Sequence, residues 1–128
     1  MKNTQVTQLA AGTAFATLTV TNGTGVDVSA HEEALVFLNV TEITGTSPTF
    51  DVHLETSWDG TTYCDFPTAA AASSPVSYVF AQKIAAGTEM LRIGNFGKFV
   101  RAVYDLGGAD DPTVTFSVQF VGKRRQHG

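Results

Sequence analysis

The chain has 128 residues, a length that fits one domain with a single core. Apolar residues make up 43% of the chain, enough to build that core, whereas charged residues make up only 16%. Residues 1–122 hold five Lys and Arg residues against twelve Asp and Glu residues, so their negative balance argues against nucleic-acid binding by the folded body.

The sequence also lacks the features of disulfide-bonded or cysteine-ligated metal proteins and those of membrane or secreted proteins. Cys64 is the single cysteine, so neither an intrachain disulfide nor a multi-cysteine metal site can form. We expect Cys64 to be a buried or half-buried strand residue rather than a catalytic thiol. No apolar run reaches signal-peptide or membrane-span length, so we expect a protein made in the cytoplasm, without a membrane partner.

The two ends of the chain differ from its middle. Residues 1–12 are polar and lack a sustained period, which predicts an N-terminal arm. Residues 13–122 alternate strands and turns and form the predicted domain. Residues 123–128 are a basic tail, which we expect to be either a solvated end or a contact for an acidic neighbour or nucleic acid.

Period-two alternation predicts strands along the middle of the chain. In 50–57 and 113–120, apolar and polar residues alternate strictly, as in strands with one buried face. Residues 34–40, "ALVFLNV", are apolar on both faces, which predicts a central strand covered on both sides. Further strands are predicted at 15–20, 26–28, 76–84, 89–93 and 98–106.

Gly, Pro, Asn and Asp clusters separate these runs and predict turns. The one helix-leaning stretch, 67–75, is bounded by Pro at both ends and is predicted to be an exposed loop. The pattern therefore predicts an all-β fold, an antiparallel two-sheet sandwich of eight or nine strands with jelly-roll topology as the leading arrangement. Segments 37–55 and 99–119 share a strand–loop–Pro-Thr–strand plan, which suggests two similar hairpins.

"SWDGTTY" breaks the alternation that ends at residue 57. Asp59-Gly60 is a short hairpin signal, because Gly accepts a positive φ and Asp tolerates it. Trp58 stands at the shoulder of this turn. It either packs over the edge of the core or against a neighbouring subunit, or, together with Tyr63 and Asp59, binds a sugar ring by stacking.

Candidate metal sites and catalytic sites are weak in the sequence. His53 lies on a polar strand face between Asp51 and Glu55, where a weak ion is conceivable but a solvated face is the default. His31 and His127 lie far from it in sequence. The loop carboxylates Asp105, Asp110 and Asp111 lack calcium-loop spacing. Since no nucleophile, zinc or phosphate motif occurs, we expect no enzyme, no cofactor and no metal.

Two segments carry a resemblance to a known family. "LETSWDGTTY" (54–63) is similar to a hairpin found in small virion proteins of tailed bacteriophages, and "GKFVRAVYDLGG…PTVTFSVQFVGK" (97–123) resembles the closing strand and final hairpin of the same proteins. With "TGTSPTFDVHLE" (45–55), the likeness covers about two thirds of the chain. It implies a β-sandwich located on the capsid surface of a virion, a decoration (cement) protein that contacts the major capsid protein and forms trimers.

The sequence-based hypothesis is therefore a decoration protein that stabilises a phage shell by bridging its subunits. Two alternatives stay open: a carbohydrate-binding jelly roll for host attachment, and a tail or head–tail connector component. The residues expected to contact partners lie at the N-terminus, around the hairpin and at the C-terminus: Thr4, Gln5, Val6, Gln8, Leu9, Trp58, Tyr63, Lys123, Arg124 and Arg125.

Overall fold

The computed structural model describes residues 4–65, 79–94 and 96–124. Within these ranges every regular element is a strand, and every strand pair is antiparallel, so the predicted all-β antiparallel fold is confirmed. The described residues contain no helix able to cross a membrane. The seven strands of the sheet are β1 (Thr4–Phe15), β2 (Thr21–Asn22), β3 (Val26–Asp27), β4 (His31–Ser57), β5 (Tyr63–Asp65), β6 (Gly87–Gly94) and β7 (Phe99–Arg124).

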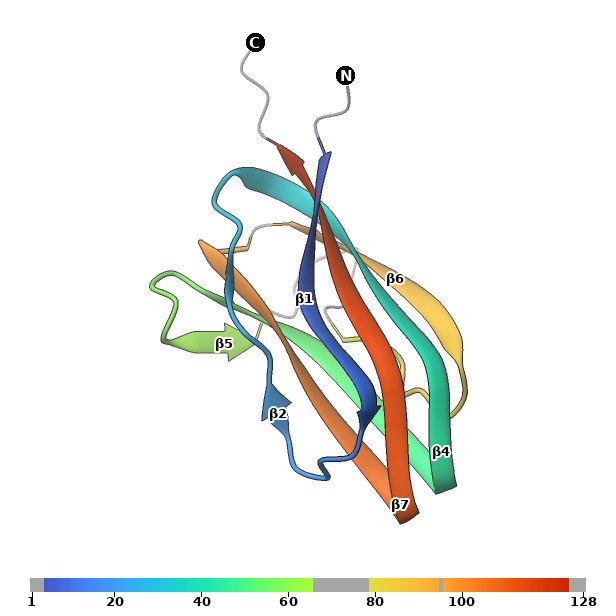
Figure 1. Ribbon diagram of the computed structural model, residues 1–128. Helices are drawn as coiled ribbons and strands as arrows, with labels where there is room; N and C mark the ends of the chain where they lie inside the picture. Colours follow the sequence, from blue (N-terminus) through green and yellow to red (C-terminus); the bar gives the residue numbers. More distant parts are fainter. Residues whose placement is uncertain (1–3, 66–78, 95, 125–128) are drawn as a thin grey trace, which may run out of the picture.

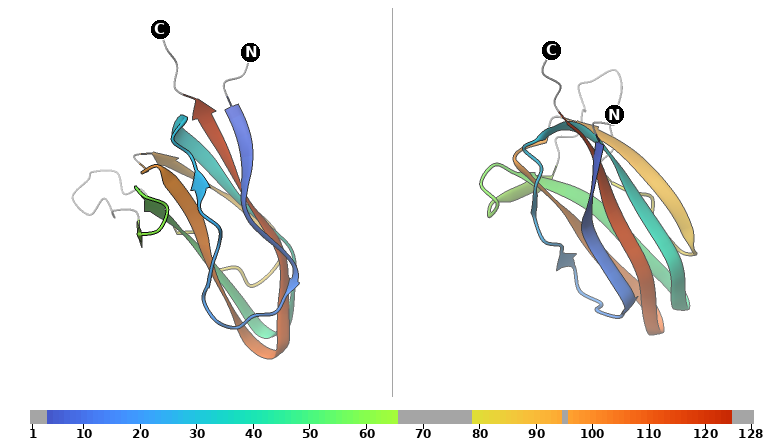
Figure 2. Two further views of the ribbon diagram at one scale, coloured as in Figure 1. Left: turned by 60° about the vertical axis from the view of Figure 1, so that its left-hand side comes forward. Right: turned by 45° about the horizontal axis from the view of Figure 1, so that its top comes forward.

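The fold is built on one long ribbon made of β4 and β7. Their pairing runs from His31 opposite Arg124 to Ser57 opposite Phe99. Both strands bend sharply together around residues 44–49 and 107–112, so the two halves of the ribbon run side by side (Figures 1 and 2). The bend uses positive φ angles, among them +111° at Gly45 and +127° at Gly108, which glycine adopts at low cost.

The bend divides the sheet into two halves. The β1 half contains β1, β6, residues 31–44 of β4 and residues 113–124 of β7. The β5 half contains β2, β3, β5, residues 49–57 of β4 and residues 99–107 of β7. All these strands belong to one hydrogen-bonded sheet, and the two-sheet sandwich with jelly-roll topology stays a prediction.

The core lies between the two halves. Phe50 of the β5 half and Phe116 of the β1 half have ring centroids 4.7 Å apart, and Tyr104 lies 5.0 Å from Phe116. The strict alternation seen in the sequence is confirmed, because the inward residues of both runs are buried. These are Phe50, Val52, Leu54 and Thr56 in β4, and Val114, Phe116, Val118 and Phe120 in β7.

The internal similarity between 37–55 and 99–119 has a different meaning from the one expected. The two segments do not form two separate hairpins; they pair with each other as the central parts of β4 and β7. The turn signals at 45–48 and 107–112 bend the ribbon without ending either strand. Runs predicted as separate strands therefore fuse, and the described residues contain seven strands instead of eight or nine.

The N-terminal segment differs most from the sequence-based expectation. Residues 4–12, expected in an arm, belong to β1, which pairs with β7 and buries Leu9 at 3% exposure. Register shifts between Gln8 and Ala10 and between Gly12 and Phe15 interrupt the period of two, which conceals the strand in the sequence.

Two other predicted strands are wrong or incomplete. Residues 16–20 lie outside any strand, and Leu18 and Val20 are exposed. In the predicted run 76–84, residues 76–78 lie outside the described residues, as does the predicted loop 67–75. The remainder makes two isolated bridges, at Val79 and Lys83, and buries Phe80.

Candidate protein-docking face

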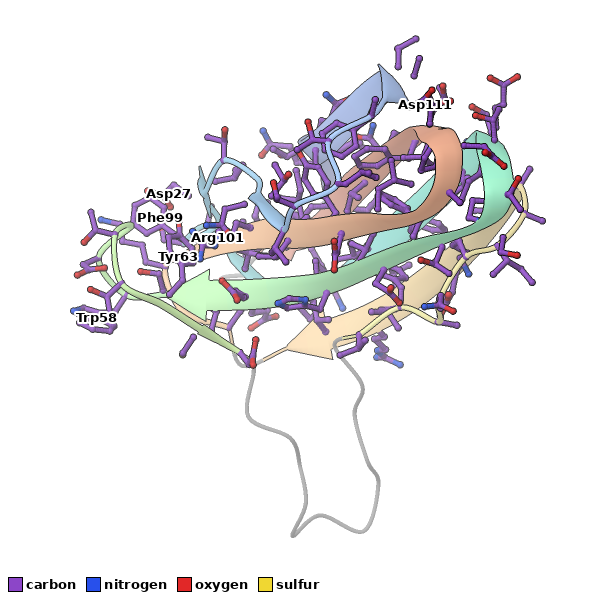
Figure 3. The ribbon with its side chains drawn as sticks, turned by 90° about the horizontal axis from the view of Figure 1, so that it is seen from below. Asp27, Trp58, Tyr63, Phe99, Arg101 and Asp111 are labelled. Atoms are coloured by element: carbon purple, nitrogen blue, oxygen red, sulfur yellow. The ribbon has the colours of Figure 1, made fainter. Side chains whose placement is uncertain are left out.

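The residues predicted to bind partners fall into two separate groups. Thr4 lies opposite Lys123, so the start of β1 and the end of β7 are neighbours at the same end of the molecule (Figure 1). Trp58 and Tyr63 lie in the β5 half, beyond the end of β4 (Figure 3). The structure therefore does not bring the two groups together.

The terminal group contains one residue unsuited to its predicted role. Leu9 lies in the core, so its side chain cannot contact a partner, whereas Gln5, Val6 and Gln8 are exposed. The Gln119 amide Nε2 donates a hydrogen bond to Gln8 Oε1 at 3.2 Å. Arg124 is placed by its backbone as the last residue of β7, and Arg125, with the rest of the predicted tail, lies outside the described residues.

An apolar surface covers the outward side of the β1 half. Leu35 of β4 lies opposite Val121 of β7, which in turn lies opposite Val6 of β1. Phe37 of β4 lies opposite Met90 of β6. Side chains from four strands thus occupy neighbouring positions, and we call these five residues the apolar face.

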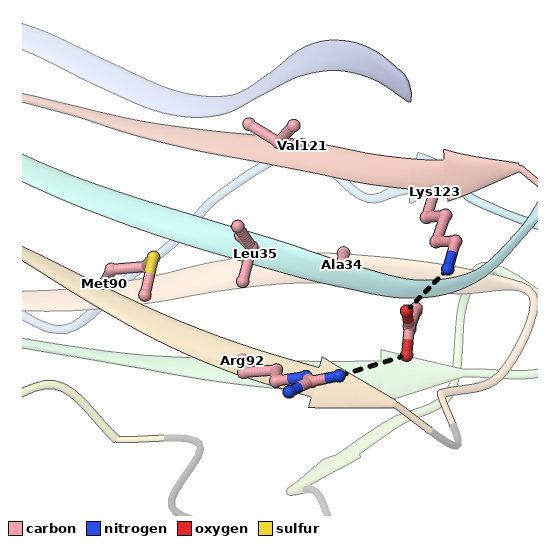
Figure 4. A pocket seen from close by; sticks show the side chains of 7 residues that line it. Ala34, Leu35, Met90, Arg92, Val121 and Lys123 are labelled. Atoms are coloured by element: carbon pink, nitrogen blue, oxygen red, sulfur yellow. Dashed lines mark ion pairs between the residues drawn. The ribbon is translucent and has the colours of Figure 1, made fainter. Parts of the chain in front are cut away.

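The exposure of the apolar face shows that it is only partly covered. Val6 is 65% exposed and Met90 49%, while Leu35, Phe37 and Val121 are half-buried. A hollow of about 410 Å³ lies over this surface, lined by Glu33, Ala34, Leu35, Met90, Arg92, Val121 and Lys123 (Figure 4). Contiguous exposed apolar surface of this kind is typical of sites that bind other molecules.

Charged side chains border the apolar face on one side. Glu33 carboxylate oxygens lie 3.4 Å from Lys123 Nζ and 3.8 Å from an Arg92 guanidinium nitrogen (Figure 4). All three side chains are well exposed, so these ion pairs contribute only about 0–1 kcal/mol to stability. They therefore do little to hold the fold together.

Most of the apolar face is not evident from the sequence, although residues 34–40 carry one signal for it. "ALVFLNV" predicted a strand covered on both sides. The inward residues of this run are buried, but its outward residues Leu35 and Phe37 are only half-buried among the described residues. The expected second covering is therefore not supplied by the described part of the chain.

The hairpin turn predicted at Asp59-Gly60 is confirmed, and its hydrogen bonds occupy Asp59. Gly60 has a φ of +83°. The Asp59 carboxylate accepts hydrogen bonds from the backbone N–H groups of Thr62 at 2.8 Å and Thr61 at 2.9 Å, and from the Ser57 hydroxyl. These bonds, led by the one from Thr62, hold the pKa of Asp59 well below its ordinary value.

The three residues suggested for a sugar site are not equally suited to one. Asp59 is engaged in its own turn, and the Arg101 guanidinium lies over the Tyr63 ring, 4.0 Å from its centroid. Trp58 is 67% exposed and stands apart from Tyr63 (Figure 3). Of the three, only Trp58 offers an open aromatic surface.

A polar cluster occupies the outward side of the β5 half. His53 Nε2 lies 3.2 Å from Glu55 Oε2 and 3.5 Å from Asp65 Oδ1. Arg101 donates two hydrogen bonds to Glu55 Oε1, from Nε at 2.9 Å and from a terminal nitrogen at 2.6 Å. We call His53, Glu55 and Asp65 the His53 cluster. Sequence reasoning placed His53 beside Glu55 but missed Asp65, which reaches it through strand pairing.

Arg101 and His53 control the charge state of Glu55. Partial burial alone would raise the pKa of this carboxyl group. The hydrogen bonds and positive charge of Arg101, together with the hydrogen bond to His53, outweigh burial and lower the pKa of Glu55. Glu55 is therefore a carboxylate at neutral pH, with one oxygen held by Arg101 and the other directed at His53.

The remaining candidates are accounted for by local structure. Asp110 accepts a hydrogen bond from the Thr46 hydroxyl within the bend, and Asp111 is exposed. Among the described residues, the His53 cluster is the one group of three side chains able to hold a metal ion. Cys64 is exposed, contrary to the expectation of a buried or half-buried residue, because β5 is a short edge strand.

Neither protein-family models nor curated proteins give a match to the chain. The geometry of the two outward surfaces is therefore the basis for a functional interpretation.

Proposed function

We propose that the protein is a structural virion component, a capsid decoration protein that binds the assembled phage shell through the apolar face. The observation that carries the proposal is the incompletely covered outward side of residues 34–40. Apolar side chains from four strands meet there, and a protein partner would remove them from water. The resemblance of residues 54–63 and 97–123 to phage virion proteins supplies the class of partner.

The energetics of such docking are favourable. Full burial of a Val, Leu, Met or Phe side chain stabilises a complex by roughly 1.5–3 kcal/mol per residue before the cost of association. The pairs that Glu33 makes with Lys123 and Arg92 lie at the border, where charges set orientation with little desolvation. A protein that binds only the assembled shell stabilises that shell by mass action.

The test is co-sedimentation of the purified protein with capsids of a phage that carries it. Met90→Glu places a charge within the apolar face, on β6 beside Phe37, so we expect at least about a tenfold loss of binding. Ile84→Glu is the matched control, because Ile84 is a similarly exposed apolar residue (67%) outside that face. Equal binding by both variants, or equal loss, would contradict the proposal.

Deletion of the N-terminal residues is a poor test of docking. Because β1 pairs with β7 and buries Leu9, removal of residues 1–12 would damage the sheet as well as any interface. The point variants separate the two effects. Light scattering on wild type and Met90→Glu adds a second check: a change in oligomeric number without capsids would assign the apolar face to self-association.

Glycan binding is kept as a second candidate because Trp58 is 67% exposed at the start of the hydrogen-bonded 58–62 loop. An exposed indole on a rigid loop can stack on a sugar ring. A glycan array probed with wild type and Trp58→Ala distinguishes this function. Signals that disappear in Trp58→Ala would support it, and ring-shaped oligomers in electron micrographs would instead support a connector.

A further inference from the structure

Two of the three separations in the His53 cluster are those of a metal site. Two ligand atoms bound to one zinc ion at about 2.0–2.1 Å lie roughly 3.0–3.4 Å from each other, for octahedral to tetrahedral angles. The observed separations from His53 Nε2 are 3.2 Å to Glu55 and 3.5 Å to Asp65, and all three ligand atoms lie within 4.8 Å of one another. To complete the site, the Glu55 and Asp65 carboxylates would rotate toward the ion until their oxygens also lie about 3.4 Å from each other.

We propose that His53, Glu55 and Asp65 bind a divalent transition-metal ion, with Zn²⁺ as the best-suited ion. One imidazole and two carboxylates suit zinc, whereas Ca²⁺ and Mg²⁺ prefer sites with oxygen ligands alone. Three protein ligands leave positions on the metal for water. The site lies on the outward side of the β5 half and does not depend on the proposed docking function.

The paired strands β4 and β5 position all three ligands. His53 and Glu55 are two residues apart on β4 and therefore share a face, and Glu55 lies opposite Asp65 of β5. Two carboxylates directly opposite each other repel, and this repulsion weakens the pairing of β4 with β5. A cation between them would convert that repulsion into attraction.

Arg101 orients the central ligand. Its two hydrogen bonds occupy Glu55 Oε1 and leave Oε2, the oxygen nearest His53, to face the metal position. Arg101 is itself held against the Tyr63 ring, 4.0 Å from its centroid. A residue that fixes a ligand in this way commonly changes metal affinity about 10–100-fold when it is replaced.

Bound metal would connect the 58–62 loop to the body of the sheet. The loop joins Ser57 at the end of β4 to Tyr63 at the start of β5, and β5 has only three residues. A metal ion shared by β4 and β5 would therefore anchor the loop that carries Trp58. Because such a site binds the folded chain, zinc would raise the melting temperature.

The experiment is isothermal titration of the untagged full chain with zinc chloride at neutral pH. We expect one zinc ion per chain in the wild type, and at least about tenfold weaker binding in His53→Gln and in Asp65→Asn. Two controls should keep wild-type affinity. Asp51→Asn changes another carboxylate on the same face of β4, and Cys64→Ser removes the neighbouring thiol.

A second measurement, the melting temperature, distinguishes loss of zinc binding from misfolding of a variant. The melting temperature of the wild type should rise with zinc and return with a chelator, and His53→Gln should melt normally without zinc but show no rise. Absence of zinc binding by the wild type, or wild-type affinity in His53→Gln, would overturn the proposal. Loss of binding in Cys64→Ser would assign the ion to the thiol instead.

Discussion

The two halves of the sheet use the same pair of strands in opposite ways. In both halves, β4 and β7 direct buried apolar residues toward the shared core. On the outward side, the β1 half presents Leu35 and Val121, whereas the β5 half presents Glu55 and Arg101 joined by hydrogen bonds. The inward pattern sets the fold, whereas the outward pattern differs between the halves, being apolar in the β1 half and polar and hydrogen-bonded in the β5 half.

The contrast suggests a polarity for the molecule. Apolar outward residues are stabilised when another protein covers them, while the hydrogen-bonded polar residues are already satisfied and lose water at a cost. We therefore expect the β1 half to face the partner and the β5 half to face solvent.

The largest predicted effect comes from a substitution in the core that the two halves share. Phe116 is 4% exposed and contacts Phe50 and Tyr104 across the core. Phe116→Ala should lower the free energy of unfolding by about 3–5 kcal/mol, because it leaves a cavity between the halves. Urea unfolding measures this, and a loss below about 1 kcal/mol would show that the halves are not packed as described.

The next largest effect is expected on the polar outward side of the β5 half. Arg101→Gln removes the cation that pairs with Glu55, whose side chain is only 16% exposed. We expect a loss of about 1–3 kcal/mol, because a largely buried carboxylate keeps fewer partners. Glu55→Gln and the double variant complete a thermodynamic cycle measured by urea unfolding. Strict additivity would show that the pair is not coupled in solution.

The sequence reveals this contrast only where apolar and polar residues alternate without interruption. Strict alternation in 50–56 and 113–120 identifies the inward residues directly. The bulges in β1 interrupt its period and conceal that strand. Asp65 joins His53 only through the pairing of Glu55 with Asp65, and this register depends on the length of the 58–62 loop. No local pattern records such a pairing.

A smaller effect concerns the pH dependence of stability that Glu55 gives to the β5 half. The pKa of Glu55 in the folded protein lies below its ordinary value of 4.5. The stability from this group is therefore fully present above that value and is lost as pH falls through the folded-state pKa. With a chelator present, Glu55→Gln should lose less stability than wild type between about pH 6 and pH 3. Identical acid profiles would contradict the assigned role of Arg101.

The most direct test of the polarity compares oxidation of Met90 and Trp58 in the unbound and the capsid-bound protein. Both are exposed in the described structure, at 49% and 67%, and lie in opposite halves. Hydroxyl-radical labelling followed by mass spectrometry reports the accessibility of each side chain. The account predicts that capsid binding protects Met90 and leaves Trp58 as reactive as before. Protection of Trp58 with unchanged oxidation of Met90 would contradict it.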